Sequence, residues 1–216
     1  MPKVGMEPER RAEATNAALA CMCDMGIDHI TLEMVAERAG FSKGIVAYYF
    51  KTKKQLILES LKAFLSSYQQ KSKAGITAGM QPRDMLDVIV ETSLPLLNAQ
   101  DASEINVSTL DGADKICLPE QKLARLFVQF VAKAVTDEEV LAVMREAYIS
   151  DTRSIAGLIN YIKQGRPDFQ MDENEAAYAL LALIYGLSFF RVARFMPEGE
   201  NDNRQVAFNF VNRWFD

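Results

Sequence analysis

The chain has 216 residues, of which 49% are hydrophobic and 25% are charged, and this is an ordinary composition for a globular protein with a substantial core. Its N-terminus lacks the apolar segment of a signal peptide, and its longest charge-free apolar run, residues 176–190, is shorter than the roughly 18 residues of a membrane-spanning helix, so we expect a cytoplasmic protein that binds no membrane. The net charge of −5 argues against a nucleic-acid partner, but the first 60 residues hold 8 basic and 8 acidic side chains, so the acidic excess belongs to the rest of the chain.

The N-terminal part has apolar residues at intervals of three and four, and this spacing predicts helices. Pro8 favours the start of a first helix, and Gly26 is suited to end it. Thr31 is placed to cap a short second helix over residues 32–39, which stops at Gly40.

The next helices follow closely. Ser42 is placed to cap a short helix over residues 43–49. Thr52 and Gln55 form a capping-box pair that opens a long helix to about residue 73. Beyond this point the same periodicity predicts helices near residues 83–98, 119–134, 137–164, 173–195 and 203–215.

Two of these later helices have a further start signal. Thr136 with Glu139, and Asp172 with Glu175, have the spacing of capping boxes. Residues 100–118 allow no prediction, except that the alternation in INVSTL is compatible with one strand. The sequence as a whole predicts an all-α fold.

One short motif raises the question of catalysis. Residues 40–44 read GFSKG, which matches the G-x-S-x-G pattern of serine hydrolases. That pattern needs a strand before the serine and a histidine after it. Here a predicted helix precedes Ser42, and the only histidine, His29, comes before the motif, so we expect no catalytic residue.

Metal and cofactor sites are not expected either. His29 stands just before the second helix, where we expect a surface or turn residue. The spacing of the cysteines fits neither a disulfide framework nor a zinc site, and we expect reduced thiols at Cys21, Cys23 and Cys117.

The same segment fits a different structure, the helix-turn-helix motif. Gly40 and Phe41 provide a tight turn between two short helices. In this motif the second helix enters the major groove of DNA with its N-terminal end, so Lys43 and Gly44 lie where base edges and phosphates are met. Residues 39–58 contain four lysines and no acid, which favours DNA binding over the alternative of a helical hairpin with a solvated lysine face.

A family resemblance supports this interpretation. The segment TLEMVAERAGFSKGIVAYYFKTKKQL, residues 31–56, resembles the signature of the TetR family of one-component transcriptional regulators, and the helical remainder resembles its nine-helix layout. The start MPKVGM, followed by Arg10 and Arg11, is similar to the choline-sensing repressors of betaine-synthesis genes within that family. The resemblance implies a helix-turn-helix DNA-binding domain over residues 1–52 and a ligand-binding and dimerisation domain over residues 53–216.

The resemblance also implies individual DNA contacts. Thr31 anchors a phosphate at the start of its helix, where the helix dipole favours an anion, and Lys53 clamps a second phosphate. Tyr49 and Phe50 connect the DNA-binding unit to the body. Many family members carry tyrosine where this chain has Ala47. Ala47 cannot make the usual tyrosine contact with a phosphate, and the resemblance makes Tyr48 the candidate for this contact. The predicted DNA-binding residues are Thr31, Ser42, Lys43, Gly44, Ala47, Tyr48, Tyr49 and Lys53.

A homodimer is expected, because one recognition helix buries too little surface for a tight specific site. Residues 176–190 are apolar all round and must be covered on several sides, and apolar residues recur at every fourth position in the last helix. The alternative is that both helices only close the core of the protomer. The predicted dimer residues are Leu183, Leu187, Phe190, Val206, Phe210 and Trp214.

The resemblance finally implies a pocket among the fifth to eighth helices that binds a small-molecule effector. The candidate lining residues are Phe127, Phe130, Tyr148, Tyr161, Tyr178 and Tyr185, with ordinary core packing as the alternative. A choline-like cation needs an aromatic box. Because Phe127 and Val131 stand where the choline-sensing subfamily is expected to carry tryptophan, another hydrophobic or cationic effector is an equal candidate.

The sequence therefore predicts a homodimeric regulator that binds a palindromic operator in double-stranded DNA, as a repressor released by its ligand. The alternative is a helical protein that binds a small molecule or a partner without binding DNA. The operator, the regulated genes and the identity of the effector stay open.

Overall fold

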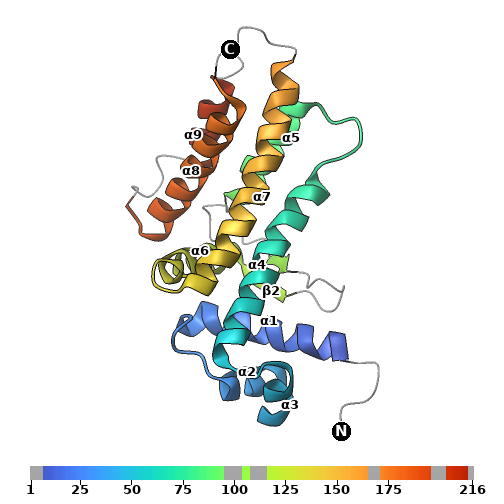
Figure 1. Ribbon diagram of the computed structural model, residues 1–216, viewed down its shortest axis with the longest axis vertical. Coiled ribbons are helices and arrows are strands. Elements are labelled where there is room, and N and C mark those ends of the chain that lie inside the picture. The colour runs from blue at the N-terminus through green and yellow to red at the C-terminus, as the bar shows by residue number, and fades with distance from the viewer. Residues whose placement is uncertain (1–6, 95–103, 108–115, 165–170, 196–202, 214–216) are drawn as a thin grey trace. The chain divides into compact units, whose positions relative to one another are not determined.

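The computed structural model describes residues 7–94, 104–107, 116–164, 171–195 and 203–213 (Figure 1). Within these residues the chain forms nine helices and two short strands. The helices are α1 (Glu7–Met25), α2 (Leu32–Ala39), α3 (Lys43–Tyr49), α4 (Lys53–Gly75), α5 (Pro82–Ser93), α6 (Glu120–Ala134), α7 (Glu138–Lys163), α8 (Glu173–Val192) and α9 (Asn203–Asn212).

The prediction of an all-α fold is confirmed, with one addition. Strands β1 (Glu104–Val107) and β2 (Ile116–Pro119) pair antiparallel, with Glu104 opposite Pro119. They lie in the segment for which the periodicity allowed no prediction, and β1 overlaps the INVSTL alternation.

The chain divides into two compact units. Unit 1 consists of residues 1–69 and 100–144, and unit 2 of residues 70–99 and 145–216. Helices α4 and α7 each contribute residues to both units. The predicted boundary at residue 52 separates a DNA-binding domain from a ligand-binding and dimerisation domain. It is a boundary between functions, and it stays a prediction.

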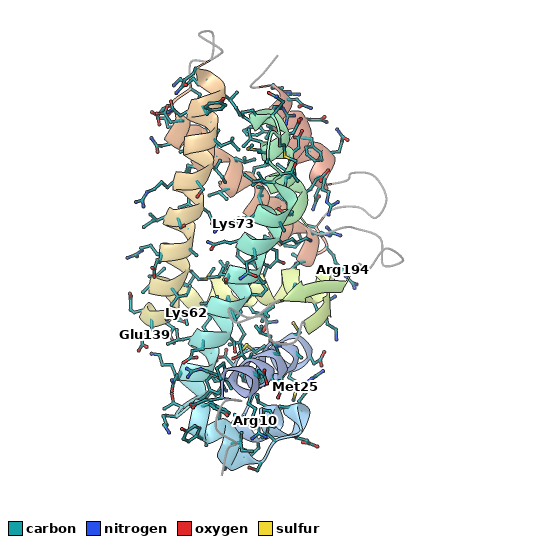
Figure 2. The ribbon with its side chains drawn as sticks, turned by 90° about the vertical axis from the view of Figure 1, so that its right-hand side faces the viewer. Arg10, Met25, Lys62, Lys73, Glu139 and Arg194 are labelled. Carbon is teal, nitrogen blue, oxygen red and sulfur yellow. The ribbon has the colours of Figure 1, made fainter. Side chains whose placement is uncertain are left out.

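The core of unit 1 joins the first three helices to α4 and α6. Phe64 of α4 contacts Phe130 of α6 with 5.7 Å between ring centroids, and both side chains are fully buried. Figure 2 shows the side chains around α1, with labels on Arg10 near its start and on Met25 at its C-terminal end. Other fully buried residues of this core are Leu19, Met22, Ile30, Phe50, Leu56, Leu61, Leu123 and Leu126.

The ends of α2 follow the local signals. The Met34 N–H donates to the Thr31 hydroxyl over 3.2 Å, which confirms the predicted cap. Gly40 ends the helix in the left-handed conformation with φ 68°, a conformation that glycine adopts without steric cost. Ser42 also occupies the expected cap position before α3, but its hydroxyl makes no capping hydrogen bond.

Two predicted boundaries need correction. Helix α7 is capped by Asp137, which accepts from the N–H groups of Glu139 and Val140, and Thr136 instead donates to the Lys133 carbonyl. Helix α8 ends before the predicted residue 195, because Arg194 adopts a positive φ of 55° that the helix cannot contain. The predicted Asp172 cap of α8 is confirmed, because its carboxylate accepts from the N–H groups of Asn174 at 2.9 Å and Glu175 at 3.1 Å.

The core of unit 2 is formed by α5, α7, α8 and α9. Helix α9 is held by two side-chain bonds to backbone carbonyls, from Asn203 to Leu187 at 3.1 Å and from Arg204 to Leu94 at 2.9 Å. The fully or nearly fully buried apolar residues here are Leu86, Val90, Leu94, Ile155, Ile159, Leu180, Ile184, Ala207 and Val211.

Among the described residues, one helix is long and apolar enough to cross a membrane by length and composition, namely α8 with a mean hydropathy of 1.4. The charge-free part of this helix, residues 176–190, is shorter than the helix itself. The core helix of a soluble protein passes the same test, and α8 buries its Leu180 and Ile184 side in the core of unit 2.

Candidate nucleic-acid interface

Helix α3 has one buried and one exposed side. Val46 is fully buried and Tyr49 is 3% exposed, so these two side chains hold the helix against the core of unit 1. The exposed side carries Ser42, Lys43, Gly44 and Tyr48, with Ala47 partly exposed. We call these five residues the α3 face.

The burial of Tyr49 corrects its place among the predicted DNA contacts. One residue advances a helix by about 100°, so Tyr48 and Tyr49 cannot point the same way. Tyr48 is 51% exposed and meets the ring of Tyr49 edge to face at 5.3 Å. The burial of Tyr49 and Phe50 holds the end of α3 in the core of unit 1, and their role in connecting the DNA-binding unit to the body stays a prediction. A direct DNA contact by Tyr49 does not agree with its burial.

Gly44 is not required by packing within the protein. A Cβ atom built at this position meets only the Ser42 hydroxyl oxygen, at 3.9 Å. A glycine in a helix costs up to about 1 kcal/mol relative to alanine. Packing inside the protein therefore does not explain why this residue is a glycine.

Lys53 lies beside the loop that leads into α2. Its ammonium group donates to the backbone carbonyl of Asp28, while the Asp28 carboxylate forms an ion pair with Lys133 of α6 at 2.7 Å. The hydrogen bond from Lys133 is the main reason why the pKa of Asp28 is lowered. Lys53 is thus held at Asp28, three positions before Thr31, which is exposed at the start of α2.

Lys51 is a candidate contact that the sequence-based choice of residues missed. Its ammonium group lies 5.2 Å from the ring centroid of Tyr48, in a cation–π arrangement. The signal in the sequence is the spacing of three between the tyrosine and the lysine, within the lysine-rich window already noted.

A hydrogen-bond network supports the turn that carries Lys51. Arg11 of α1 donates to the carboxylate of Glu59 on α4, with 3.0 Å between Nε and Oε2, and its guanidinium lies 5.5 Å from the ring centroid of Phe50. Glu59 accepts from the Gln55 amide at 3.1 Å, and Gln55 accepts from the Lys51 N–H at 3.0 Å. A chain of hydrogen bonds through Glu59 and Gln55 therefore connects the Lys51 backbone to Arg11 of α1.

The four lysines of the basic window have different partners. Lys54 forms ion pairs with Asp137 and Glu139, and Lys43 pairs with Glu33 of α2. Lys51 and Lys53 form no salt bridge with any residue that the structure describes. Their charges are therefore available to an external anion.

The predicted dimer residues differ in exposure. Leu187 is only 7% exposed in the core of unit 2, which agrees with the alternative that α8 closes the core of the protomer. Leu183, Val206 and Phe210 are half-buried against the same core. Phe190 is 48% exposed, and Trp214 lies outside the described residues.

An exposed aromatic cluster at the end of α8 was missed. Phe189 and Phe195 lie next to Phe190, and the three ring centroids are 5.8 to 6.2 Å apart. Because Phe189 directly precedes a predicted dimer residue in the apolar run, the sequence contained a signal for it, whereas Phe195 lies beyond the helix end.

The predicted ligand residues do not form one group. Phe130 is buried in unit 1 with Phe127 packed against that core, and Tyr161 of α7 is exposed. Three tyrosines meet in unit 2, where the ring of Tyr148 lies 6.4 Å from that of Tyr178 and 6.3 Å from that of Tyr185. Burial is the main cause that raises the pKa of Tyr185, followed by the nearby charge of Asp151.

A cavity of about 490 Å³ lies beside this tyrosine cluster. It is lined by Tyr148 and by polar and apolar residues of α7 and α8, among them Ile149, Thr152, Arg153, Asn160, Glu173 and Asn174.

Among the described residues, no group of three or more His, Cys, Asp or Glu side chains is arranged to hold a metal ion. Cys21 and Cys23 are free thiols, and burial is the main cause that raises the pKa of Cys23 to about 12.

Comparison with known proteins shows which proteins this chain is similar to. Residues 14–60 match the family of bacterial regulatory proteins named tetR. The chain is 36% identical over 93 residues to the HTH-type transcriptional regulator BetI of Agrobacterium fabrum, which covers 43% of this chain and 45% of the relative. It is 33% identical over 93 residues to BetI of Rhizobium meliloti, covering 43% and 46% of the two chains. The matched part therefore spans about half the length of these relatives.

Solved structures extend the similarity of fold over nearly the whole chain. A TetR transcription regulator from Haloarcula marismortui has a TM-score of 0.73 at 17% identity, covering 96% of each chain. A transcriptional regulator from Saccharomonospora viridis in complex with choline has a TM-score of 0.72 at 19% identity, again covering 96% of each chain. Residues 14–60 therefore match the tetR family of bacterial regulatory proteins, and the chain shares the fold of these solved regulators over nearly its whole length.

Proposed function

We propose that the protein is a sequence-specific DNA-binding transcriptional regulator that acts as a dimeric repressor and is released from its operator by a small molecule. Residues 1–52 are assigned the DNA-binding role and residues 53–216 the ligand-binding and dimerisation roles. The observation that carries the proposal is the exposed α3 face beside Lys51 and Lys53, two cations without a salt bridge in the described part of the chain.

The α3 face has the chemistry that a recognition helix needs. The start of α3 presents a hydroxyl, an ammonium group and a bare backbone, at Ser42, Lys43 and Gly44 respectively. Such groups meet base edges and the adjacent phosphates when a helix enters the major groove with its N-terminal end. Lys51 and Lys53 then meet phosphates on the flanks, which adds affinity for any DNA sequence and makes binding sensitive to salt.

The function is tested by an electrophoretic mobility shift of the duplex that lies upstream of the protein's own gene, measured over a range of salt concentrations. We expect a specific shift that weakens steeply as the salt concentration rises. A helical protein that binds only a small molecule or a protein partner gives no shift at any salt concentration, and that result would reject the proposal.

Lys53→Ala is expected to weaken binding to all DNA sequences and to reduce the slope of log affinity against log salt by about one, because one phosphate contact is lost. The matched control is Lys54→Ala, which removes the same charge from the next residue. Lys54 is paired with Asp137 and Glu139, so its loss should leave the salt slope unchanged. An unchanged slope for Lys53→Ala removes this residue from the interface.

The dimer is proposed to form through the exposed side of α8. Ala182, Phe189 and Phe190 are exposed on this helix, and the last two belong to the aromatic cluster described above. A two-fold axis brings the same surface of both protomers together. It also allows two recognition helices to reach successive major grooves, which are about 34 to 36 Å apart.

The effector is proposed to bind beside the tyrosine cluster of unit 2. The electron-rich faces of Tyr148 and Tyr178 and the nearby charge of Asp151 favour a small organic cation, although Arg153 also lines the cavity and Glu173 is paired with Lys163 at 3.1 Å. The related regulator from Saccharomonospora viridis was solved with choline, which makes choline the first compound to test.

We expect choline to raise the melting temperature in proportion to the logarithm of its concentration and to weaken the operator shift. Tyr148→Ala should remove both effects, whereas Tyr161→Ala, a change at an exposed tyrosine of the same helix, should retain them. Absence of a thermal shift at millimolar choline excludes choline and leaves the DNA-binding proposal unaffected.

A further inference from the structure

We infer that Glu33 competes inside the protein with a DNA phosphate, because its carboxylate occupies the anion-binding position at the start of α2 and thereby lowers the affinity for all DNA. The inference rests on the proposed function, since it concerns the same surface. It assigns to an acidic residue a role in DNA binding that neither the motif nor the comparisons assign.

The carboxylate of Glu33 lies between the beginnings of two helices. Glu33 stands in the first turn of α2, and its Oε1 atom forms an ion pair with the ammonium group of Lys43, the first residue of α3. The side chains are 56% and 64% exposed. The pair therefore stands on the protein surface next to Ser42 and Gly44, within the region proposed to meet DNA.

Three donors surround this carboxylate. The pKa of Glu33 is lowered first by the hydrogen bond from Lys43, then by its own backbone N–H, and also by the hydroxyl of Thr31. The Thr31 oxygen accepts from the Met34 N–H, so its hydrogen is free to be donated to Glu33. A lysine, a helix N-terminal N–H and a hydroxyl are the groups that bind phosphate at helix N-termini.

The ion pair has no evident structural task. Exposed pairs add little to stability because water and salt screen them. The helices it joins are already packed through Val35, Ala36 and Val46, all buried in the core of unit 1. When DNA binds, its phosphate and the Glu33 carboxylate compete for the same hydrogen-bond donors. The two anions also repel each other.

The size of the effect follows from Coulomb's law. Two unit charges about 4 Å apart in water change an equilibrium constant roughly fivefold, and added salt reduces this factor. Removal of the Glu33 charge should therefore strengthen DNA binding by about fivefold at low salt. Phosphate contacts carry no sequence information, so operator and unrelated DNA should gain equally.

Glu33→Gln tests the inference, because glutamine keeps the shape and loses the charge. Affinities for the operator and for an unrelated duplex are measured from low to physiological salt, beside the wild-type protein. We expect both duplexes to bind about fivefold more tightly at low salt, with the gain shrinking as salt rises. A gain in affinity cannot be produced by a misfolded variant.

Two controls separate position from net charge. Glu37→Gln removes the same charge one turn further along α2, at an exposed residue without a salt bridge to any described side chain, and should change affinity little. Glu33→Asp keeps the charge and should bind like the wild type.

Each other outcome rejects the inference. An unchanged or weaker affinity for Glu33→Gln would show that Glu33 orients Lys43 instead of competing with DNA. An equal gain for Glu37→Gln would show an effect of net charge alone. If the wild-type protein shifts no DNA, the proposed function fails and this inference with it, whereas a wild-type shift with no gain overturns the inference alone.

Discussion

Phe50→Ala is expected to lower the free energy of unfolding by about 3–5 kcal/mol, the usual cost of deleting a buried phenyl ring. Phe50 is fully buried at the end of α3, and the guanidinium of Arg11 lies against its ring. The lost ring leaves a cavity where α1, α3 and α4 meet, so the α3 face should also lose its fixed orientation. Urea unfolding followed by circular dichroism measures the first effect, and the operator shift measures the second.

Tyr48→Ala is the matched variant for this prediction. Tyr48 is 51% exposed two residues before Phe50, so its removal should change the free energy of unfolding by no more than about 0.5 kcal/mol. Because Tyr48 belongs to the α3 face and holds Lys51 in a cation–π contact, operator binding should still weaken. Equal losses of stability in the two variants would contradict the division between the core and the α3 face.

The double variant Phe189→Glu, Phe190→Glu is expected to be monomeric and to bind the operator at least about a hundredfold more weakly, since two linked recognition helices gain 10²- to 10⁴-fold over one. Both rings are nearly half exposed at the end of α8, at 45% and 48%. Charges placed there would face each other across the two-fold axis without water, which is strongly unfavourable. Analytical ultracentrifugation gives the oligomeric state.

The control for the dimer prediction is Tyr161→Glu, because this side chain of α7 is 63% exposed and lies outside the proposed interface. It should remain dimeric and bind the operator like the wild type. Circular dichroism should show the same helix content in all three proteins, since each replaced side chain is exposed. A double variant that stays dimeric at micromolar concentration would place the interface elsewhere.

Helix ends were predicted best where one side chain bonds a backbone group within the next few residues. Thr31 and Asp172 accept from N–H groups two or three positions ahead, so the sequence alone contains both partners. The start of α7 shows the limit of this reasoning. Thr136 and Asp137 are both good caps, and only the path of the chain selected Asp137.

The candidate interface was predicted as a segment but not as a surface. Four lysines in residues 39–58 indicated a site for an anion. Their sequence does not say that Lys54 meets Asp137 and Glu139, because those acids are more than 80 positions away in the chain. The inferred competition by Glu33 likewise depends on a pair formed between two helices.

The sequence by itself determined the helical class and predicted the helix-turn-helix motif, because periodicity, caps and turn glycines act over three or four residues. The resemblance to the TetR family rested on the particular residues of segment 31–56. Only the tertiary structure decided that Tyr48 faces outward while Tyr49 is buried, and which lysines keep their charge unpaired. Burial and ion pairing join residues that are distant in the chain, so they depend on the packing of whole helices and not on the local order of residues.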